Sequence, residues 1–188
     1  IAVLVSGTGS NLQALLDYEK RGGNPDGCIV LVIADRSCGA LDHAAEHRVP
    51  ALVLDRRTLG KNEFERSLLA SLKQHSIDLV VLAGFLTILS EKVTGLYRRR
   101  IINIHPSLIP SFCGKGYYGE RVHQAALQRG VKVSGATVHL VDEVADGTTE
   151  EQAERDGPAP VPEPPHRGDD DREHDEREEG EQPGRLVP

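Results

Sequence analysis

Asn103 and His105 stand two residues apart where a predicted strand ends, and their side chains suit acyl transfer. The run Ile101–Ile104 reads as a short buried strand, and Pro106 cannot donate to a strand ladder, so the strand must stop there. Side chains alternate along a strand, so Asn103 and His105 share one face. An amide N–H can stabilise a tetrahedral oxyanion, and an imidazole can carry a proton near neutral pH. A histidine that merely caps a strand would show the same spacing, which leaves both interpretations open.

The glycine-rich segment Ser6–Asn11 lies between the first predicted strand and the first predicted helix. Glycines let the backbone approach an anion, and the N–H groups at a helix start favour phosphate. The segment is not a dinucleotide fingerprint, because Leu12 stands where the third glycine would be, and no Walker-type Gly-Lys-Ser/Thr follows. A tight turn capped by Ser10 or Asn11 would explain the same residues, so the pattern alone leaves both open.

Three other features suit a ligand site, and each also has a simpler interpretation. The segment Leu82–Ser90 is apolar for a connection after the fourth strand, which core packing alone would explain. Lys61 begins the third predicted helix, where a solvated lysine is common. Asp146 follows the sixth predicted strand and could be an ordinary loop acid, with Asp142 and Glu143 as alternatives.

Four motifs together resemble those of the 10-formyltetrahydrofolate-dependent formyltransferases, in particular the glycinamide ribonucleotide formyltransferases. The motifs occur in that family's order over residues 1–147, roughly four fifths of the chain. Four motifs in order make a specific signal. They are Ser6-Gly7-Thr8-Gly9-Ser10-Asn11-Leu12-Gln13, Leu82-Ala83-Gly84-Phe85-Leu86-Thr87-Ile88-Leu89-Ser90, Asn103-Ile104-His105-Pro106-Ser107-Leu108 and Gly135-Ala136-Thr137-Val138-His139.

The resemblance implies a reaction. A formyl group would pass from 10-formyltetrahydrofolate, the co-substrate, to the amine of 5′-phosphoribosylglycinamide in de novo purine biosynthesis, without a metal. Three alternatives remain: a formyltetrahydrofolate hydrolase, a methionyl-tRNA formyltransferase, and an inactive remnant that still binds folate or phosphate.

The resemblance also implies roles for individual residues. Asn103 and His105 are expected to stabilise the oxyanion, and Asp146, three residues after a glutamate, to orient His105 and favour its protonated form. The substrate phosphate is expected to lie at Gly9, Ser10 and Asn11. Folate contacts are expected from Lys61, Leu86, Thr87, Ile88, Leu89 and Asn103. Many family members carry a basic residue where Thr87 stands.

Strand-like and helix-like segments alternate along the chain and predict how these residues are positioned. The strand runs are continuous and apolar, which is typical of parallel strands buried on both faces, and Phe64, Leu68 and Leu72 form an apolar helical stripe. The alternation predicts an α/β fold with a doubly wound, mostly parallel sheet and helices on both faces, a Rossmann-like arrangement. The predicted strands are Ile1–Val5, Cys28–Ala34, Ala51–Leu54, Leu79–Leu82, Ile101–Ile104 and Ala136–Val141. The predicted helices are Asn11–Lys20, Ala40–Arg48, Lys61–His75, Glu91–Tyr97 and Gly119–Arg129.

The formal net charge of −7 is distributed unevenly over the 188 residues. Residues 1–146 carry 17 Lys and Arg against 15 Asp and Glu, whereas residues 147–188 carry 5 against 14. The first part therefore lacks a basic field for nucleic acid, and no apolar run approaches the ~20 residues that span a bilayer. Cys28, Cys38 and Cys113 show no paired spacing, which favours a reducing compartment. We expect a cytoplasmic monomer or homodimer that acts on small molecules.

The composition changes abruptly after residue 147. Residues 147–188 contain seven prolines and three sizeable aliphatic side chains, too little apolar surface to offset ordering entropies of ~1–2 kcal/mol per residue. We expect a catalytic domain over 1–147 and an acidic, Pro-rich disordered tail over 148–188. The family continues instead with an apolar strand and helix, so out-of-frame translation of a GC-rich gene is one hypothesis. The chain contains no methionine, and we expect further encoded residues before Ile1.

Overall fold

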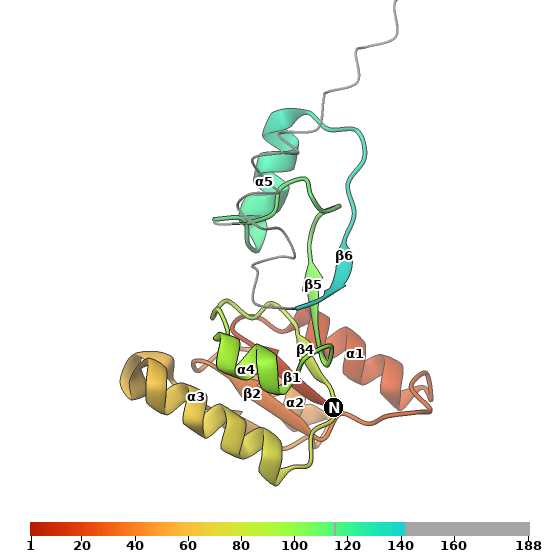
Figure 1. Ribbon diagram of the computed structural model, residues 1–188. Helices are drawn as coiled ribbons and strands as arrows, with labels where there is room; N and C mark the ends of the chain where they lie inside the picture. The colour runs from red at the N-terminus through yellow and green to blue at the C-terminus, as the bar shows by residue number, and fades with distance from the viewer. Residues whose placement is uncertain (115, 142–188) are drawn as a thin grey trace, which may run out of the picture.

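The computed structural model describes residues 1–114 and 116–141, which form a six-stranded sheet flanked by helices (Figure 1). The strands are β1 (Ala2–Val5), β2 (Leu31–Ala34), β3 (Ala51–Val53), β4 (Val80–Leu82), β5 (Ile101–His105) and β6 (Thr137–Leu140). The helices are α1 (Ser10–Lys20), α2 (Ala40–Glu46), α3 (Arg56–Gln74), α4 (Glu91–Leu96) and α5 (Glu120–Arg129). Every predicted strand and helix is present, with its ends shifted by a few residues.

The strand order β3-β2-β1-β4-β5-β6 confirms the doubly wound, mostly parallel sheet. Neighbouring strands from β3 to β5 pair in parallel, whereas β6 pairs antiparallel with β5. The expectation that the sixth run is a parallel strand buried on both faces is therefore wrong. Within the described residues β6 is the last strand of the sheet, and its Val138 and Leu140 are exposed while Thr137 and His139 are half-buried.

Two apolar clusters fill the two sides of the sheet, because successive strand side chains point to opposite faces. On one face, α3 and α4 pack against alternate residues of β1 and β2. On the other face, α1 and α2 pack against the intervening residues. The first cluster includes Ala2, Leu4, Leu31, Ile33, Phe64, Leu68, Leu72 and Val93, and the second includes Val3, Val5, Leu12, Leu16, Val32, Ala34, Ala40 and Ala44.

The glycine-rich loop turns into α1 through Gly9, which has a positive φ of 86°. A Cβ at this position would lie 2.6 Å from the Cα of Ala40, so only glycine lets the loop pack against α2. No side chain caps α1. The prediction that Ser10 or Asn11 caps this helix is wrong, because the Gly9 turn makes both of them helical residues with exposed side chains.

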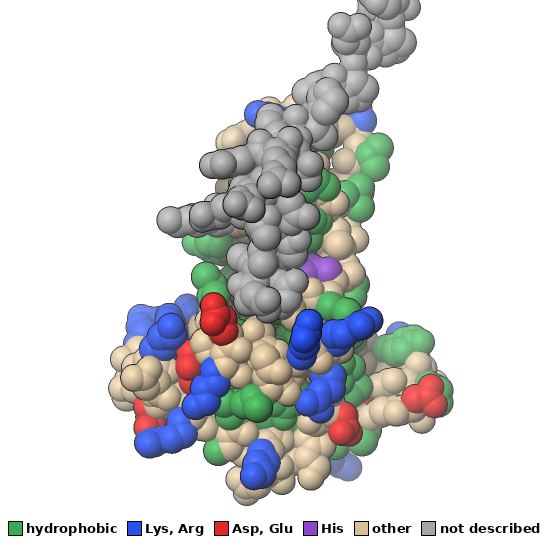
Figure 2. All heavy atoms as spheres, viewed as in Figure 1, with side chains coloured by type: hydrophobic (Ala, Val, Ile, Leu, Met, Phe, Trp, Pro, Cys, Tyr) green, Lys and Arg blue, Asp and Glu red, His purple; other side chains and the backbone are tan. Residues whose placement is uncertain are grey.

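The surface differs between the body of the molecule and the ribbon formed by β5 and β6. Figure 1 shows this ribbon and α5 extending beyond the body formed by β1–β4 and α1–α4. In Figure 2, Lys and Arg side chains and a few acidic ones are scattered over the visible face of the body, and hydrophobic side chains show on both the body and the extension. Leu127 of α5 is 80% exposed and Val138 of β6 is 66% exposed. Within the described residues, no helix combines the length and the apolar character needed to cross a membrane.

Candidate active site

The loops that follow β1, β4 and β5 lie side by side, because these strands are neighbours in the sheet. β1 pairs in parallel with β4, and β4 pairs in parallel with β5. The order of strand addition reverses between β1 and β4, and open α/β sheets bind ligands beyond the carboxyl ends of their strands at such a point. The structure therefore brings the predicted phosphate loop, the predicted folate loop and the Asn103–His105 pair together at the carboxyl ends of the strands.

Gly9, Ser10 and Asn11 form the amino end of α1 at this edge. The first intrahelical hydrogen bond is donated by the N–H of Gln13 to the carbonyl of Gly9 at 2.8 Å. The N–H groups in the first turn of a helix have no acceptor within the helix and favour an anion. No acidic residue occupies this first turn. The arrangement suits a phosphate group, and the binding roles of these three residues stay a prediction.

The loop after β4 presents its apolar side chains outward. Leu86 is 46% exposed and Ile88 is 82% exposed, while Leu89 is half-buried against the core. Thr87 lies between them and is only 8% exposed. Two exposed aliphatic side chains on a ligand-facing loop could cover a flat aromatic ligand, which fits the predicted folate contacts of Leu86 and Ile88.

Asn103 and His139 face each other across the two strands of the ribbon. The register pairs these residues directly, and the Asn103 Nδ2 lies 3.1 Å from the His139 Nε2. The amide nitrogen can only donate, so the His139 Nε2 accepts and the Nδ1 carries the hydrogen. That tautomer also explains the 3.2 Å approach of the His139 Nδ1 to the Leu140 carbonyl. His139 therefore orients the amide of Asn103. The sequence indicates a structural role for His139, but its pairing with Asn103 depends on the antiparallel register and could not be predicted.

His105 ends β5 on the same face as Asn103 and is 4% exposed. Its Nε2 lies 2.8 Å from the Phe112 carbonyl, which can only accept a hydrogen bond, so the Nε2 carries a hydrogen. This contact fixes the plane of the imidazole ring. The prediction that Asn103 and His105 share one face is confirmed by the register, in which Asn103 opposes His139 and His105 opposes Thr137.

Thr137 fastens the turn after β5 to β6. Its hydroxyl donates to the Ser107 carbonyl at 2.7 Å and accepts from the Ile109 N–H at 3.0 Å. Ser107 is 1% exposed and donates to the Ser111 carbonyl at 2.5 Å. The turn that supplies the Phe112 carbonyl to His105 is thus held by hydrogen bonds from both of its ends.

A buried polar cluster joins the loops after β1, β2 and β4. Asp35 is 2% exposed and accepts from the Arg36 Nε at 2.8 Å and from the Thr87 hydroxyl at 2.6 Å. The Leu86 N–H donates to the Ser6 hydroxyl at 2.9 Å. Burial alone would raise the pKa of the Asp35 carboxyl, but hydrogen bonds from Arg36, Thr87 and Ser6 and the charge of Arg36 outweigh it and lower that pKa. Asp35 could not be singled out from the sequence, because contacts between distant loops leave no local pattern.

Of the remaining predicted site residues, Lys61 is not brought to the other candidates, and Asp146 cannot be placed. Lys61 is exposed on α3, just after Gly60 interrupts the helical backbone, and no described hydrogen bond or ion pair connects it to the other candidates. Asp146, with its alternatives Asp142 and Glu143, lies outside the described residues. Among the described residues, no three His, Cys, Asp or Glu side chains are grouped as a metal site would require.

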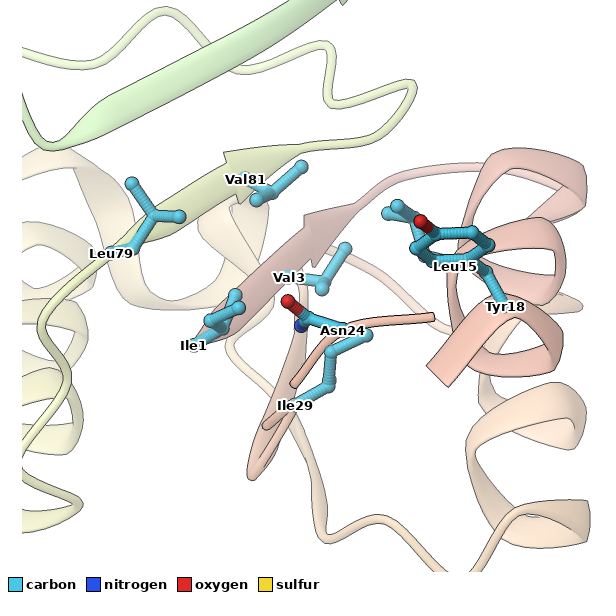
Figure 3. A pocket seen from close by; sticks show the side chains of 8 residues that line it. All are labelled: Ile1, Val3, Leu15, Tyr18, Asn24, Ile29, Leu79 and Val81. Atoms are coloured by element: carbon cyan, nitrogen blue, oxygen red, sulfur yellow. The ribbon is translucent and has the colours of Figure 1, made fainter. Parts of the chain in front are cut away.

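A hollow of about 210 Å³ lies at the other end of the strands, toward their amino ends, between the sheet and α1 (Figure 3). Its wall is almost entirely apolar and comes from the amino ends of β1 and β4, from α1 and from the connection to β2. The lining residues are Ile1, Val3, Leu15, Tyr18, Asn24, Ile29, Leu79 and Val81. Because Ile1 and Leu79 precede β1 and β4, this hollow is separate from the loops that carry the candidate site.

Comparison with known families gives a match over most of the chain. The sequence model described as "Formyl transferase" matches residues 1–149. The phosphoribosylglycinamide formyltransferase of Bacillus subtilis is 34% identical over 147 residues, covering 77% of this chain and 72% of that protein. The chloroplastic phosphoribosylglycinamide formyltransferase of Vigna unguiculata is 37% identical over 147 residues, and the chain spans about half the length of this relative, at 47%.

Comparison of structures gives the same result. Glycinamide ribonucleotide transformylase 1 from Symbiobacterium toebii superimposes with a TM-score of 0.70 and 38% sequence identity. The superposition covers 77% of this chain and 66% of that one.

Proposed function

Because the chain belongs to the formyl transferase family, we propose that it transfers a formyl group from 10-formyltetrahydrofolate to the amine of 5′-phosphoribosylglycinamide in purine biosynthesis. The observation that carries the proposal is the position of Asn103 and His105, on one face of β5 and next to the loop that follows β4. This pair supplies an amide donor and an imidazole at the edge where open α/β sheets bind ligands.

The proposed reaction begins when the amine of the ribonucleotide attacks the formyl carbon. The amide of Asn103 and protonated His105 stabilise the oxyanion of the tetrahedral intermediate. The bond from the formyl carbon to the folate nitrogen then breaks as His105 supplies a proton to that nitrogen, and the proton that the attacking amine releases returns His105 to its protonated form. The contacts from His139 to Asn103 and from Phe112 to His105 hold both donors in place, so little reorganisation accompanies the reaction.

The two substrates are proposed to lie on either side of this pair. The amino end of α1, at Gly9, Ser10 and Asn11, would bind the ribonucleotide phosphate. The loop containing Leu86 and Ile88 would cover the folate ring, with the backbone of Thr87 and the side chains of Leu89 and Lys61 contributing to the predicted folate contacts. We place the reaction in the cytoplasm on the basis of cysteine usage, and the prediction of a monomer or homodimer is carried forward with it.

The test is an assay of the purified chain with both substrates. We expect the folate absorbance to change and formylated ribonucleotide to appear by mass spectrometry, and neither change when one substrate is omitted. Release of formate without the ribonucleotide would instead indicate the hydrolase. A chain that is folded by circular dichroism and yields neither product would refute the proposal.

A further inference from the structure

The cluster of Ser6, Asp35, Arg36 and Thr87 connects three loops that are distant in the sequence. Ser6 directly follows β1, Asp35 directly follows β2, and Thr87 lies in the loop after β4. The hydrogen bond from Leu86 to Ser6 spans 80 residues, and the bond from Thr87 to Asp35 spans 52. Two successive residues of the β4 loop are thereby tied to two different loops at the ligand-binding edge.

The carboxylate of Asp35 and the hydroxyls of Ser6 and Thr87 are all hydrogen-bonded. Asp35 accepts from Arg36 at 2.8 and 3.1 Å, one bond to each carboxylate oxygen, and from Thr87 at 2.6 Å. Ser6 accepts from the Leu86 N–H and donates to Asp35. A buried carboxylate with several donors is rigid, because removing any donor leaves charge unpaired in a low-dielectric setting.

The cluster lies between the two loops that are proposed to bind the substrates, so its effect is not expected to be on stability alone. Turning Thr87 inward requires Leu86 and Ile88 to point outward, toward the face where the folate is proposed to bind. The other end of the cluster, Ser6, is the first residue of the loop proposed to hold the phosphate. A shift of this cluster would therefore displace both substrate loops together.

We infer that Asp35 is a positioning residue, which acts through Thr87 and Ser6 to set the orientation of the β4 loop for folate. This inference rests on the proposed function. It assigns Asp35 and the Thr87 hydroxyl no contact with substrate. It requires that loss of the Thr87 hydroxyl weaken folate binding while the chemical step proceeds at nearly its normal rate.

The test compares Thr87→Val with Thr94→Val. Both threonines are buried, but the hydrogen bonds of the Thr94 hydroxyl within the described part of the chain go to carbonyls of its own helix region, Ser90 and Glu91. We expect Thr87→Val to raise the KM for 10-formyltetrahydrofolate about tenfold, with kcat within about twofold of wild type. We expect Thr94→Val to change neither constant, and Thr87→Ser, which keeps the hydroxyl, to restore the wild-type KM.

A second measurement does not depend on turnover. The Leu86 amide should exchange with deuterium faster in Ser6→Ala and Thr87→Val than in wild type, and at the wild-type rate in Thr94→Val. An active Thr87→Val variant with an unchanged KM would overturn this inference and leave the proposed function standing. An equal rise in KM in Thr94→Val would do the same. If Thr87→Val does not fold, a wild-type KM and wild-type Leu86 exchange in Ser6→Ala would overturn it. A folded wild-type chain that neither binds 10-formyltetrahydrofolate in calorimetry nor turns it over would overturn the proposed function together with this inference.

Discussion

The strands β1 and β6 belong to one sheet but lie in contrasting surroundings. All four residues of β1 have 0% exposure, because β1 lies between β2 and β4 with helices over both faces. Among residues 1–114 and 116–141, β6 pairs with β5 alone, and its outward-facing Val138 and Leu140 are 66% and 47% exposed. The body around β1 therefore buries much more apolar surface per residue than the β5–β6 ribbon does.

The contrast suggests that one region of the molecule supplies most of its stability and another carries the candidate catalytic residues. Apolar burial is the dominant favourable term in folding, so the body supplies most of the stability of the described residues. Asn103 and His105 lie on β5, at the boundary where the ribbon pairs with β4 of the body, and they donate hydrogen bonds to His139 of β6 and to the Phe112 carbonyl in the turn after β5. Substitutions in the body should therefore change stability, and substitutions at the boundary should change turnover.

The largest expected effect is on turnover. His105→Ala should lower kcat/KM about 10³-fold, because proton transfer and one oxyanion donor are lost together. The melting temperature should fall by a few degrees, because removal of this buried imidazole leaves a gap and ends its hydrogen bond to the Phe112 carbonyl. His123→Ala, at an exposed histidine of α5, is the matched control and should behave as wild type. A folded His105→Ala variant with wild-type turnover would remove the proposed mechanism.

A pair of leucine substitutions tests the stability side of the contrast. Leu68 in α3 has 0% exposure, and Leu68→Ala should destabilise the protein by about 2–5 kcal/mol through the cavity it leaves. Leu127 in α5 is 80% exposed, and Leu127→Ala should cost less than about 0.5 kcal/mol. Urea denaturation measures both. Equal losses of unfolding free energy would show that α5, which extends beyond the body with the ribbon, is as important for stability as the body.

Asp35→Asn should show a pH-dependent loss of stability. At neutral pH the variant should be less stable by about 1–3 kcal/mol, because Arg36 loses its charged partner. The pKa of Asp35 in the folded protein lies below its ordinary value of 3.8, so the carboxylate stabilises the fold fully above that value and loses this effect as the pH falls through the folded pKa. Thermal unfolding should show the gap between wild type and variant closing below pH 3.8. A gap that stays constant there would contradict this account.

The smallest expected effect concerns the C-terminal segment. The seven prolines and few aliphatic residues of 147–188 predict that truncation after Gly147 leaves the melting temperature unchanged within about two degrees. Differential scanning calorimetry of the two chains measures this. A large drop would mean that the segment packs on the body or the ribbon.

The strands and helices could be predicted because each carries its own local pattern, such as the continuous apolar run of β2 or the stripe of Phe64, Leu68 and Leu72 in α3. The orientation of β6 could not, because Thr137–Leu140 would fit a strand of either direction. The start of α1 was misjudged, since Ser10 and Asn11 are good caps by type and the close approach of Gly9 to α2 decides the turn.

In the candidate site, too, the features with a local sequence pattern could be predicted and those that depend on tertiary contacts could not. Asn103 and His105 were predicted as a pair because strand alternation is a local property. Their partners His139 and Phe112 could not be predicted, because one depends on the register of β5 with β6 and the other on the path of a turn. The Asp35 cluster was missed for the same reason, since its contacts form between loops more than fifty residues apart.

The apolar hollow beside α1 has a consequence for protein engineering. It lies at the amino ends of β1 and β4, whereas the candidate catalytic residues lie beyond the carboxyl ends of their strands. Larger side chains at positions such as Val81 would fill vacant volume against Leu15 and Ile29 without touching a substrate loop. Laboratory evolution of this protein therefore has a place to gain thermal robustness that is independent of any selection on its activity.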